Sequence, residues 1–137
     1  MALGTLVDTN VLLDVITEDE TWLGWSIETL AAAADAGPLY INPIIYAEVS
    51  VRFTQVEDLE DALPPQDFRR APLPWEAAFL AGRAFLEYRR QGGVRSSTLP
   101  DFFIGAHAAV DELVLLTRDA SRYQTYFPTV ELLAPHT

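Results

Sequence analysis

The first stretch of the chain is apolar and stops abruptly at three polar residues. Residues 3–8 are mostly apolar up to Asp8, and Asp8-Thr9-Asn10 leads directly into the run VLLDVI. This pattern predicts a buried strand that runs into a helix, with Asp8 at the junction. A carboxylate at such a position must be solvated, paired or bound to a metal, because burying an unpaired charge is too costly.

The rest of the chain continues this alternation of strands and helices. Gly37-Pro38 ends one helical pattern, and Asn42 followed by Pro43 suits the N-cap and first residue of the next helix. Arg89-Arg90 suits the end of another helix, since the helix dipole favours cations there. The expected helices span residues 20–37, 43–53, 56–63, 74–93 and 100–110, and the expected further strands span residues 39–41, 113–117 and 130–134.

Strands that alternate with helices predict an α/β fold, a sandwich of helices around a mostly parallel sheet. At 137 residues we expect a single domain over residues 1–137. Ligands of such sheets bind at the carboxyl ends of the strands. Asp8 and Asp119 each follow a predicted strand, so we expect a functional site at that edge.

Composition excludes several kinds of chemistry. The chain has no cysteine, which excludes thiol nucleophiles, cysteine-bound zinc and disulfides. No run approaches the roughly 20 apolar residues of a membrane span. No basic segment precedes the first apolar stretch, so we expect no signal peptide. These features favour a cytoplasmic protein without a membrane partner.

Charge is unevenly distributed along the chain. The net charge of −11 at first argues against a nucleic-acid partner. Residues 1–50 hold eight acids and no arginine, whereas residues 51–137 hold twelve acids and all nine arginines, and lysine is absent. Any phosphate contact must therefore come from an arginine within residues 51–137. The guanidinium group of one arginine can donate hydrogen bonds to two phosphate oxygens at once.

Four carboxylates stand in apolar surroundings: Asp8, Glu48, Asp101 and Asp119. Taken singly, each has an ordinary alternative as a helix cap, an exposed helix position, a first-turn acid or a turn residue. Together they indicate a cluster, in which carboxylates about 5 Å apart repel by roughly 3 kcal/mol per pair at an effective dielectric constant near 20. Such a cluster needs shared protons or bound cations, and oxygen ligands alone favour Mg²⁺ or Mn²⁺ over zinc.

The order and context of these acids resemble those of PIN-domain ribonucleases, in particular the VapC-like toxins of type II toxin–antitoxin modules. The four motifs are VDTNVLLDV with Asp8, NPIIYAEV with Glu48, LPDFFIGAHA with Asp101 and LLTRDASRY with Asp119. The resemblance covers essentially the whole chain. It implies a PIN-like three-layer sandwich, in which a mostly parallel central sheet is flanked by helices.

The resemblance also implies an activity and partners. The four acids would hold one or two Mg²⁺ or Mn²⁺ ions, and metal-activated water would hydrolyse RNA to leave a 5′-phosphate and a 3′-hydroxyl. The expected partners are RNA, a cognate antitoxin with a basic C-terminal segment, and a second copy in a homodimer. Two alternatives stay open: a PIN-like RNA-processing nuclease without a toxin role, and a non-catalytic binding module.

Residues beside the acids have expected supporting roles. Thr9, Asn10 and Thr117 are candidates for orienting the carboxylates or a water molecule, with ordinary turn or cap roles as the alternative. The candidates for RNA contacts are arginines close to the acids in sequence, with a solvated surface position as the alternative. These arginines are Arg95, Arg118 and Arg122.

The remaining notable side chains have mainly structural interpretations. His107 is expected to be a packed or capping residue, because its spacing from Asp101 does not place both on one helix face. Four aromatic residues are expected in the core, namely Trp22, Trp25, Phe79 and Phe85. The tryptophans follow an acidic stretch, and a partly exposed surface there would suit an antitoxin.

Two other enzyme classes also place an acid at a strand end. Response-regulator receivers and haloacid-dehalogenase-type phosphatases both need a lysine, and this chain has none. The phosphatases also need a second aspartate two residues after the first, where this chain has Asn10. Both classes are therefore excluded.

Overall fold

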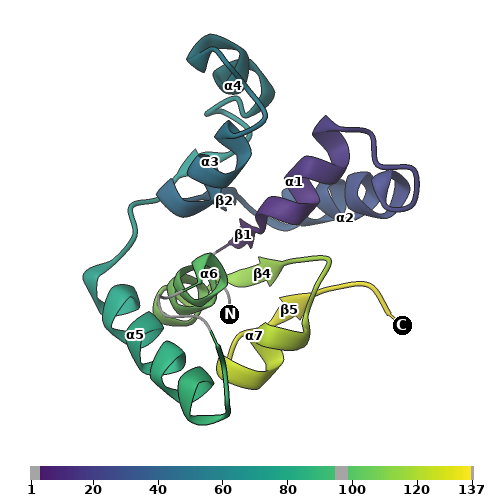
Figure 1. The fold of residues 1–137 in the computed structure, drawn as a ribbon. Helices are drawn as coiled ribbons and strands as arrows, with labels where there is room; N and C mark the ends of the chain where they lie inside the picture. The colour runs from purple at the N-terminus through teal and green to yellow at the C-terminus, as the bar shows by residue number, and fades with distance from the viewer. Residues whose placement is uncertain (1–3, 95–98, 137) are drawn as a thin grey trace.

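A parallel sheet with the strand order β3-β2-β1-β4-β5 forms the centre of the computed structural model, which describes residues 4–94 and 99–136 (Figure 1). The strands are β1 (Thr5–Val7), β2 (Leu39–Ile41), β3 (Arg69–Arg70), β4 (Val114–Leu116) and β5 (Leu132–Leu133). Every pairing between these strands is parallel, with Thr5 aligned to Leu39 on one side and to Val114 on the other. The predicted α/β fold with a mostly parallel sheet is confirmed.

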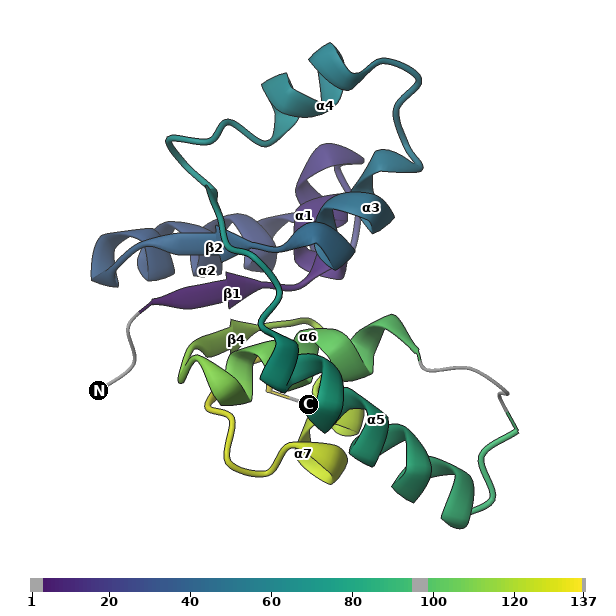
Figure 2. The ribbon, with the colours of Figure 1, turned by 90° about the vertical axis from the view of Figure 1, so that its left-hand side faces the viewer.

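Helices connect the strands and cover the sheet. They are α1 (Thr9–Ile16), α2 (Leu23–Ala36), α3 (Pro43–Ser50), α4 (Val56–Ala62), α5 (Trp75–Arg90), α6 (Pro100–Val110) and α7 (Ser121–Tyr126). Helix α1 packs against α2 and α3, and α6 packs against α3, α5 and α7. Figure 1 shows α5 and α7 on either side of α6, and Figure 2 shows β2, β1 and β4 next to one another in that order. No helix in the described part of the chain is long and apolar enough to cross a membrane.

The junctions between strands and helices follow the sequence closely. Asn42 caps α3 by accepting a hydrogen bond from the backbone N–H of Ile45 at 2.9 Å, and Pro43 occupies the first helical position. The central strands are mostly apolar, and Leu6, Val7 and Leu116 are completely buried. These strands therefore bring their carboxyl ends together at one edge of a rigid core.

His107 is part of this core, as expected. Its imidazole is fully buried and lies 2.9 Å from the side-chain nitrogen of Asn42 and 2.9 Å from a carboxylate oxygen of Asp111. Burial lowers the pKa of His107, although Asp111 opposes the shift. The histidine thus ties α6 to the start of α3.

Several expectations differ from the observed elements. The helix predicted over 43–53 ends at Ser50, because Val49, Ser50 and Val51 have lower helix propensity and the chain continues in tighter turns. Neither β3 nor α7 was expected, since both are too short to show an apolar period. Residue 3, the first of the predicted strand 3–8, lies outside the described residues.

The aromatic residues divide between the core and the surface. Trp22, Trp25 and Phe85 are partly buried, and the two tryptophan rings meet edge to face at 6.1 Å. The prediction that Phe79 lies in the core is wrong, because its side chain is 70 % exposed. Helix α5 buries a face made of small residues, centred on Ala81, and Phe79 points away from that face.

Candidate active site

Asp8 links β1 to α1 and lies at the carboxyl end of the central strand. Its Oδ1 accepts a hydrogen bond from the backbone N–H of Thr9 at 2.7 Å and so caps α1. Its Oδ2 accepts hydrogen bonds from the hydroxyls of Thr117 at 2.8 Å and Tyr123 at 2.9 Å, and a longer one from Asn10 at 3.5 Å. These donors hold a carboxylate that is only 4 % exposed.

The other three acids reach the same place from separate elements. Glu48 comes from α3, Asp101 from the first turn of α6 and Asp119 from the loop after β4. Together with Asp8 they line one pocket of about 200 Å³, which we call the acid pocket. The structure therefore brings the four predicted acids together, at the edge where parallel strands place their carboxyl ends.

The polar residues expected to support the acids all contact them. The Thr9 hydroxyl donates to Glu48 at 2.6 Å, and the Asn10 amide donates to the Thr117 hydroxyl at 3.4 Å as well as to Asp8. The backbone N–H of Asp119 donates to the Thr117 hydroxyl at 3.1 Å. Thr9 thus positions Glu48, and Thr117 connects Asp8 with the loop that carries Asp119.

Nothing in the sequence pattern points to Tyr123, which also lines the acid pocket. Its hydroxyl donates to Asp8 at 2.9 Å and lies 3.4 Å from Asp101, on a side chain that is 1 % exposed. Burial, followed by the charges of these two acids, raises the pKa of Tyr123, so the phenol stays protonated and remains a donor.

Arg118, a predicted RNA contact, is engaged within the protein. Its guanidinium donates to the two carboxylate oxygens of Asp14 at 2.9 and 3.0 Å and lies over the ring of Trp22 at 5.5 Å. Asp14 is buried and also accepts a hydrogen bond from Ser26 at 2.8 Å. The backbone N–H of Arg118 donates to Asn10 at 3.1 Å, so this ion pair fastens the loop after β4 to α1.

The other two arginines that were predicted to contact RNA are Arg122 and Arg95. Arg122 is partly exposed, and its Nη1 lies 3.2 Å from a carboxylate oxygen of Asp101. It therefore places positive charge at the rim of the acid pocket. Arg95 lies outside the described residues.

The acids carry more negative charge than the protein compensates. Burial raises the pKa of Asp8 to about 6, and the charge of Asp101 adds to this effect, while hydrogen bonds from Thr117 and Tyr123 oppose it. Burial also raises the pKa of Glu48, again with a contribution from Asp101. Deprotonating the acid pocket is therefore unfavourable unless a cation joins it.

The raised pKa of Asp8 predicts a pH-dependent stability. The folded state holds this proton up to about pH 6, whereas an unfolded aspartate releases it near 3.8. Protonation of Asp8 therefore favours folding in this range, and the free energy of unfolding should fall by about 2 kcal/mol as the pH rises from about 4 to about 6. We expect denaturant titrations in EDTA to show this fall for the wild type and not for Asp8→Asn. Equal pH slopes in both proteins would contradict the assignment.

The side chains of the acid pocket are of the type that binds a hard divalent cation. Four carboxylates face the acid pocket, and such oxygen ligands favour Mg²⁺ or Mn²⁺. Among residues 4–94 and 99–136, no three acidic, histidine or cysteine side chains are already placed so that they could hold a metal ion. The uncompensated charge at Asp8 and Glu48 is nevertheless what a divalent cation neutralises. The residues present therefore fit the predicted ion in type.

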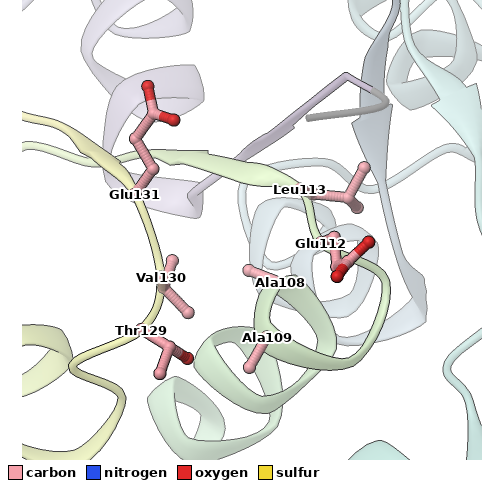
Figure 3. Close-up of a pocket in the computed structure, with 7 residues that line it drawn as sticks. All are labelled: Ala108, Ala109, Glu112, Leu113, Thr129, Val130 and Glu131. Carbon is pink, nitrogen blue, oxygen red and sulfur yellow. The ribbon is translucent and has the colours of Figure 1, made fainter. Parts of the chain in front are cut away.

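A different pocket, of about 290 Å³, lies at the opposite end of the strands (Figure 3). Val130 and Ala108 point toward one another across it, and Glu112 and Leu113 border it just before β4. Because β4 separates this pocket from Asp119, it takes no part in the acid cluster.

Comparison with known proteins agrees with the geometry. The PIN domain profile matches residues 5–128, a range that includes all four acids and Tyr123. The chain belongs to the PIN-domain family. The resemblance expected from the four motifs is thus confirmed. No protein with a curated description matches this PIN-domain chain at a significant level.

Solved structures share the fold of this PIN-domain protein. A chain of VapBC2 from Rickettsia felis bound to a promoter DNA fragment matches with a TM-score of 0.73 and 17 % identity, over 96 % of this chain and 98 % of that chain. A chain of VapBC-1 from nontypeable Haemophilus influenzae matches with a TM-score of 0.71 and 17 % identity, over 95 % and 96 %. A chain of a toxin–antitoxin complex from Klebsiella pneumoniae matches with a TM-score of 0.68 and 22 % identity, over 97 % and 98 %. At these identities the likeness shows a common fold.

Proposed function

We propose that this PIN-domain protein is a Mg²⁺- or Mn²⁺-dependent endoribonuclease that hydrolyses RNA phosphodiester bonds. The observation that carries the proposal is the convergence of Asp8, Glu48, Asp101 and Asp119 on one pocket from four separate elements. Only a shared function explains why a fold would gather four acids whose mutual repulsion is costly. Membership of the PIN-domain family supports the same activity.

The four acids would hold the cation, and neighbouring residues would keep them in place. When bound, the cation lowers the pKa of a water ligand and stabilises the negative charge that develops on the attacked phosphate. Thr9 orients Glu48, while Thr117 and Tyr123 hold Asp8 through hydrogen bonds. Because these donors come from α1, α7 and the loop after β4, they fix the carboxylates relative to the sheet.

RNA contacts are proposed for the arginines near the acids. Arg122 stands at the rim of the acid pocket and is partly exposed, so it can reach a phosphate oxygen by leaving Asp101. Arg95 and Arg118 complete the proposed set, although the bidentate pair with Asp14 limits what Arg118 can offer. The wide excess of acids makes binding of RNA without a cation weak.

We further propose that the protein is the toxin of a toxin–antitoxin pair and acts in the cytoplasm. The matched folds come from VapBC and other toxin–antitoxin complexes, which supports an antitoxin as partner. A net charge of −11 favours a partner with a basic C-terminal segment. A homodimer is proposed from the family resemblance.

Removal of the metal tests the proposed chemistry. Purified protein is expected to cleave a structured RNA in Mg²⁺ or Mn²⁺, to fall to the background rate in EDTA, and to recover when Mg²⁺ is added in excess, because the acids alone repel phosphate. Gel analysis of labelled RNA measures all three states. Cleavage that persists in EDTA would contradict the proposal. Binding of RNA without cleavage under any metal condition would favour the non-catalytic alternative.

A further inference from the structure

A second concave site, which we call the side pocket, opens directly beside the acid pocket. It has a volume of about 410 Å³ and is lined by residues from the end of α5, the start of α6 and helix α7. Asp101 and Asp119 line both pockets, so the two are neighbours that share a wall. Its volume falls within the roughly 300–1,000 Å³ of typical small-molecule pockets. A substrate held at the acids therefore passes the mouth of the side pocket.

Two tyrosines give the side pocket an aromatic wall. Tyr126 packs edge to face on Phe102 at 5.3 Å, and Tyr88 packs edge to face on Phe102 at 5.6 Å. Phe102 is fully buried in α6, whereas both tyrosines are partly exposed. The Tyr126 hydroxyl also donates to Gln91 at 3.1 Å. The aromatic wall is therefore anchored to the core before any ligand arrives.

The charges of the side pocket favour a neutral aromatic ligand with polar edges. Asp101 and Asp119 repel a phosphate group, and Arg122, the one arginine among the described residues that line the side pocket, already has its guanidinium 3.2 Å from Asp101. This guanidinium lies 5.9 Å from the Tyr88 ring, so charge and aromatic surface are adjacent. A nucleobase is uncharged, stacks on aromatic side chains and offers amino groups to carboxylates. A base fits this pocket better than a phosphate does.

We propose that the side pocket binds the base of the unpaired nucleotide next to the scissile phosphate of RNA. This inference rests on the proposed function, which places that phosphate at the acid pocket. A base can enter the side pocket only after it leaves its helical stack, since a paired and stacked base presents no free face. The protein therefore selects loops, bulges or single strands at the cleavage point.

An abasic substrate tests the proposal directly. Two short single-stranded oligoribonucleotides each lack one base, on the 5′ or the 3′ side of the cleaved bond. Loss of the base at one of these positions is expected to lower kcat/KM of the wild type by about 5- to 150-fold, mainly through KM, since stacking on one aromatic residue has this value. In Tyr126→Leu, which keeps an apolar contact with Phe102, intact and abasic substrates should be cleaved at similar rates.

Phe79→Leu is the matched control, because it replaces an exposed aromatic residue of α5 that does not line either pocket. It should discriminate against the abasic substrate as the wild type does. Cleavage that ignores both abasic positions would overturn the side pocket and leave the proposed nuclease intact. Loss of binding to a synthetic arginine-rich peptide in Tyr126→Leu, with RNA cleavage unchanged, would instead assign the pocket to a protein partner.

A binding measurement separates this proposal from the proposed function. Fluorescence anisotropy with Asp8→Asn reports binding of the same oligonucleotides without cleavage. Weaker binding of one abasic oligonucleotide, and no such difference when Tyr126→Leu is added, supports the side pocket even if the wild type cleaves no RNA. Equal binding of intact and abasic oligonucleotides overturns it.

Discussion

Asp8→Asn is expected to lower RNA cleavage by more than about 100-fold, because loss of a residue that only supports a metal ligand already costs roughly 10- to 100-fold. The amide preserves the shape of Asp8 and removes the charge that faces the acid pocket. Thr117 and Tyr123 stay in place beside it, so the change isolates the carboxylate itself. Initial rates on labelled RNA at saturating Mg²⁺ provide the measurement, and Asp101→Asn should behave in the same way.

Asp35→Asn is the matched control for these variants. Asp35 is an exposed acid near the end of α2, so its substitution makes the same chemical change away from the site and should leave the rate unaltered.

Expression of the wild type is expected to arrest growth of a bacterial host, and Asp8→Asn should abolish the arrest. Undiminished cleavage by both Asp8→Asn and Asp101→Asn would exclude the proposed centre. RNA cleavage without growth arrest would favour an RNA-processing role.

Arg118→Leu is expected to destabilise the protein by roughly 3–5 kcal/mol, the usual cost of removing one partner of a buried ion pair. Asp14 is 2 % exposed, and Arg118 supplies two of its three side-chain hydrogen bonds. The hydrogen bonds with Asp14 raise the pKa of Arg118, so the guanidinium stays charged. Without the guanidinium, a buried carboxylate keeps only Ser26. Urea denaturation at pH 7 measures the change in the free energy of unfolding.

Two further variants make this result specific. Arg83→Leu removes an exposed arginine of α5, and its effect should stay within about 0.5 kcal/mol. Adding Asp14→Asn to Arg118→Leu should recover part of the lost stability, because it removes the unpaired buried charge. If Arg118→Leu is no less stable than Arg83→Leu, the ion pair does not hold the loop after β4 in solution.

The four acids could be predicted from their positions in the pattern of strands and helices. Asp8 follows a buried strand, and Glu48 and Asp101 lie in helices that are otherwise apolar, so their chemistry stands out without any knowledge of contacts. Parallel topology then requires that strand ends meet, which placed Asp8 and Asp119 at one edge. Local pattern and topology were sufficient for this part of the site.

Contacts between distant residues could not be predicted in the same way. Tyr123 lies in a six-residue helix whose sequence has no apolar period, so its role as a donor to Asp8 had no visible signal. Arg118 was interpreted from its neighbour Asp119, yet its partner Asp14 lies 104 residues earlier in the chain. The ion pair between Asp14 and Arg118 therefore joins the acidic residues 1–50 to the arginine-containing residues 51–137.

Helix faces limited the prediction of the core. Helix α5 is long enough that one face of it is expected to be buried. Its composition did not indicate that small residues such as Ala77 and Ala81 would form that face. The larger residue Phe79 was assigned to the core by size and is exposed. Size alone is a poor guide where a close helix–helix contact, here with α6, favours small side chains.

The long separation between Asp8 and its partners also sets when the centre can form during protein synthesis. The hydroxyls of Thr117 and Tyr123 lie 109 and 115 residues after Asp8. At roughly 5–20 residues per second, a ribosome takes on the order of ten seconds to cover that distance. Until then the nascent chain carries its leading acid without the groups that hold it, and β1 lacks its neighbour β4. A translating cell therefore meets the assembled acid pocket only after Tyr123 has left the ribosome.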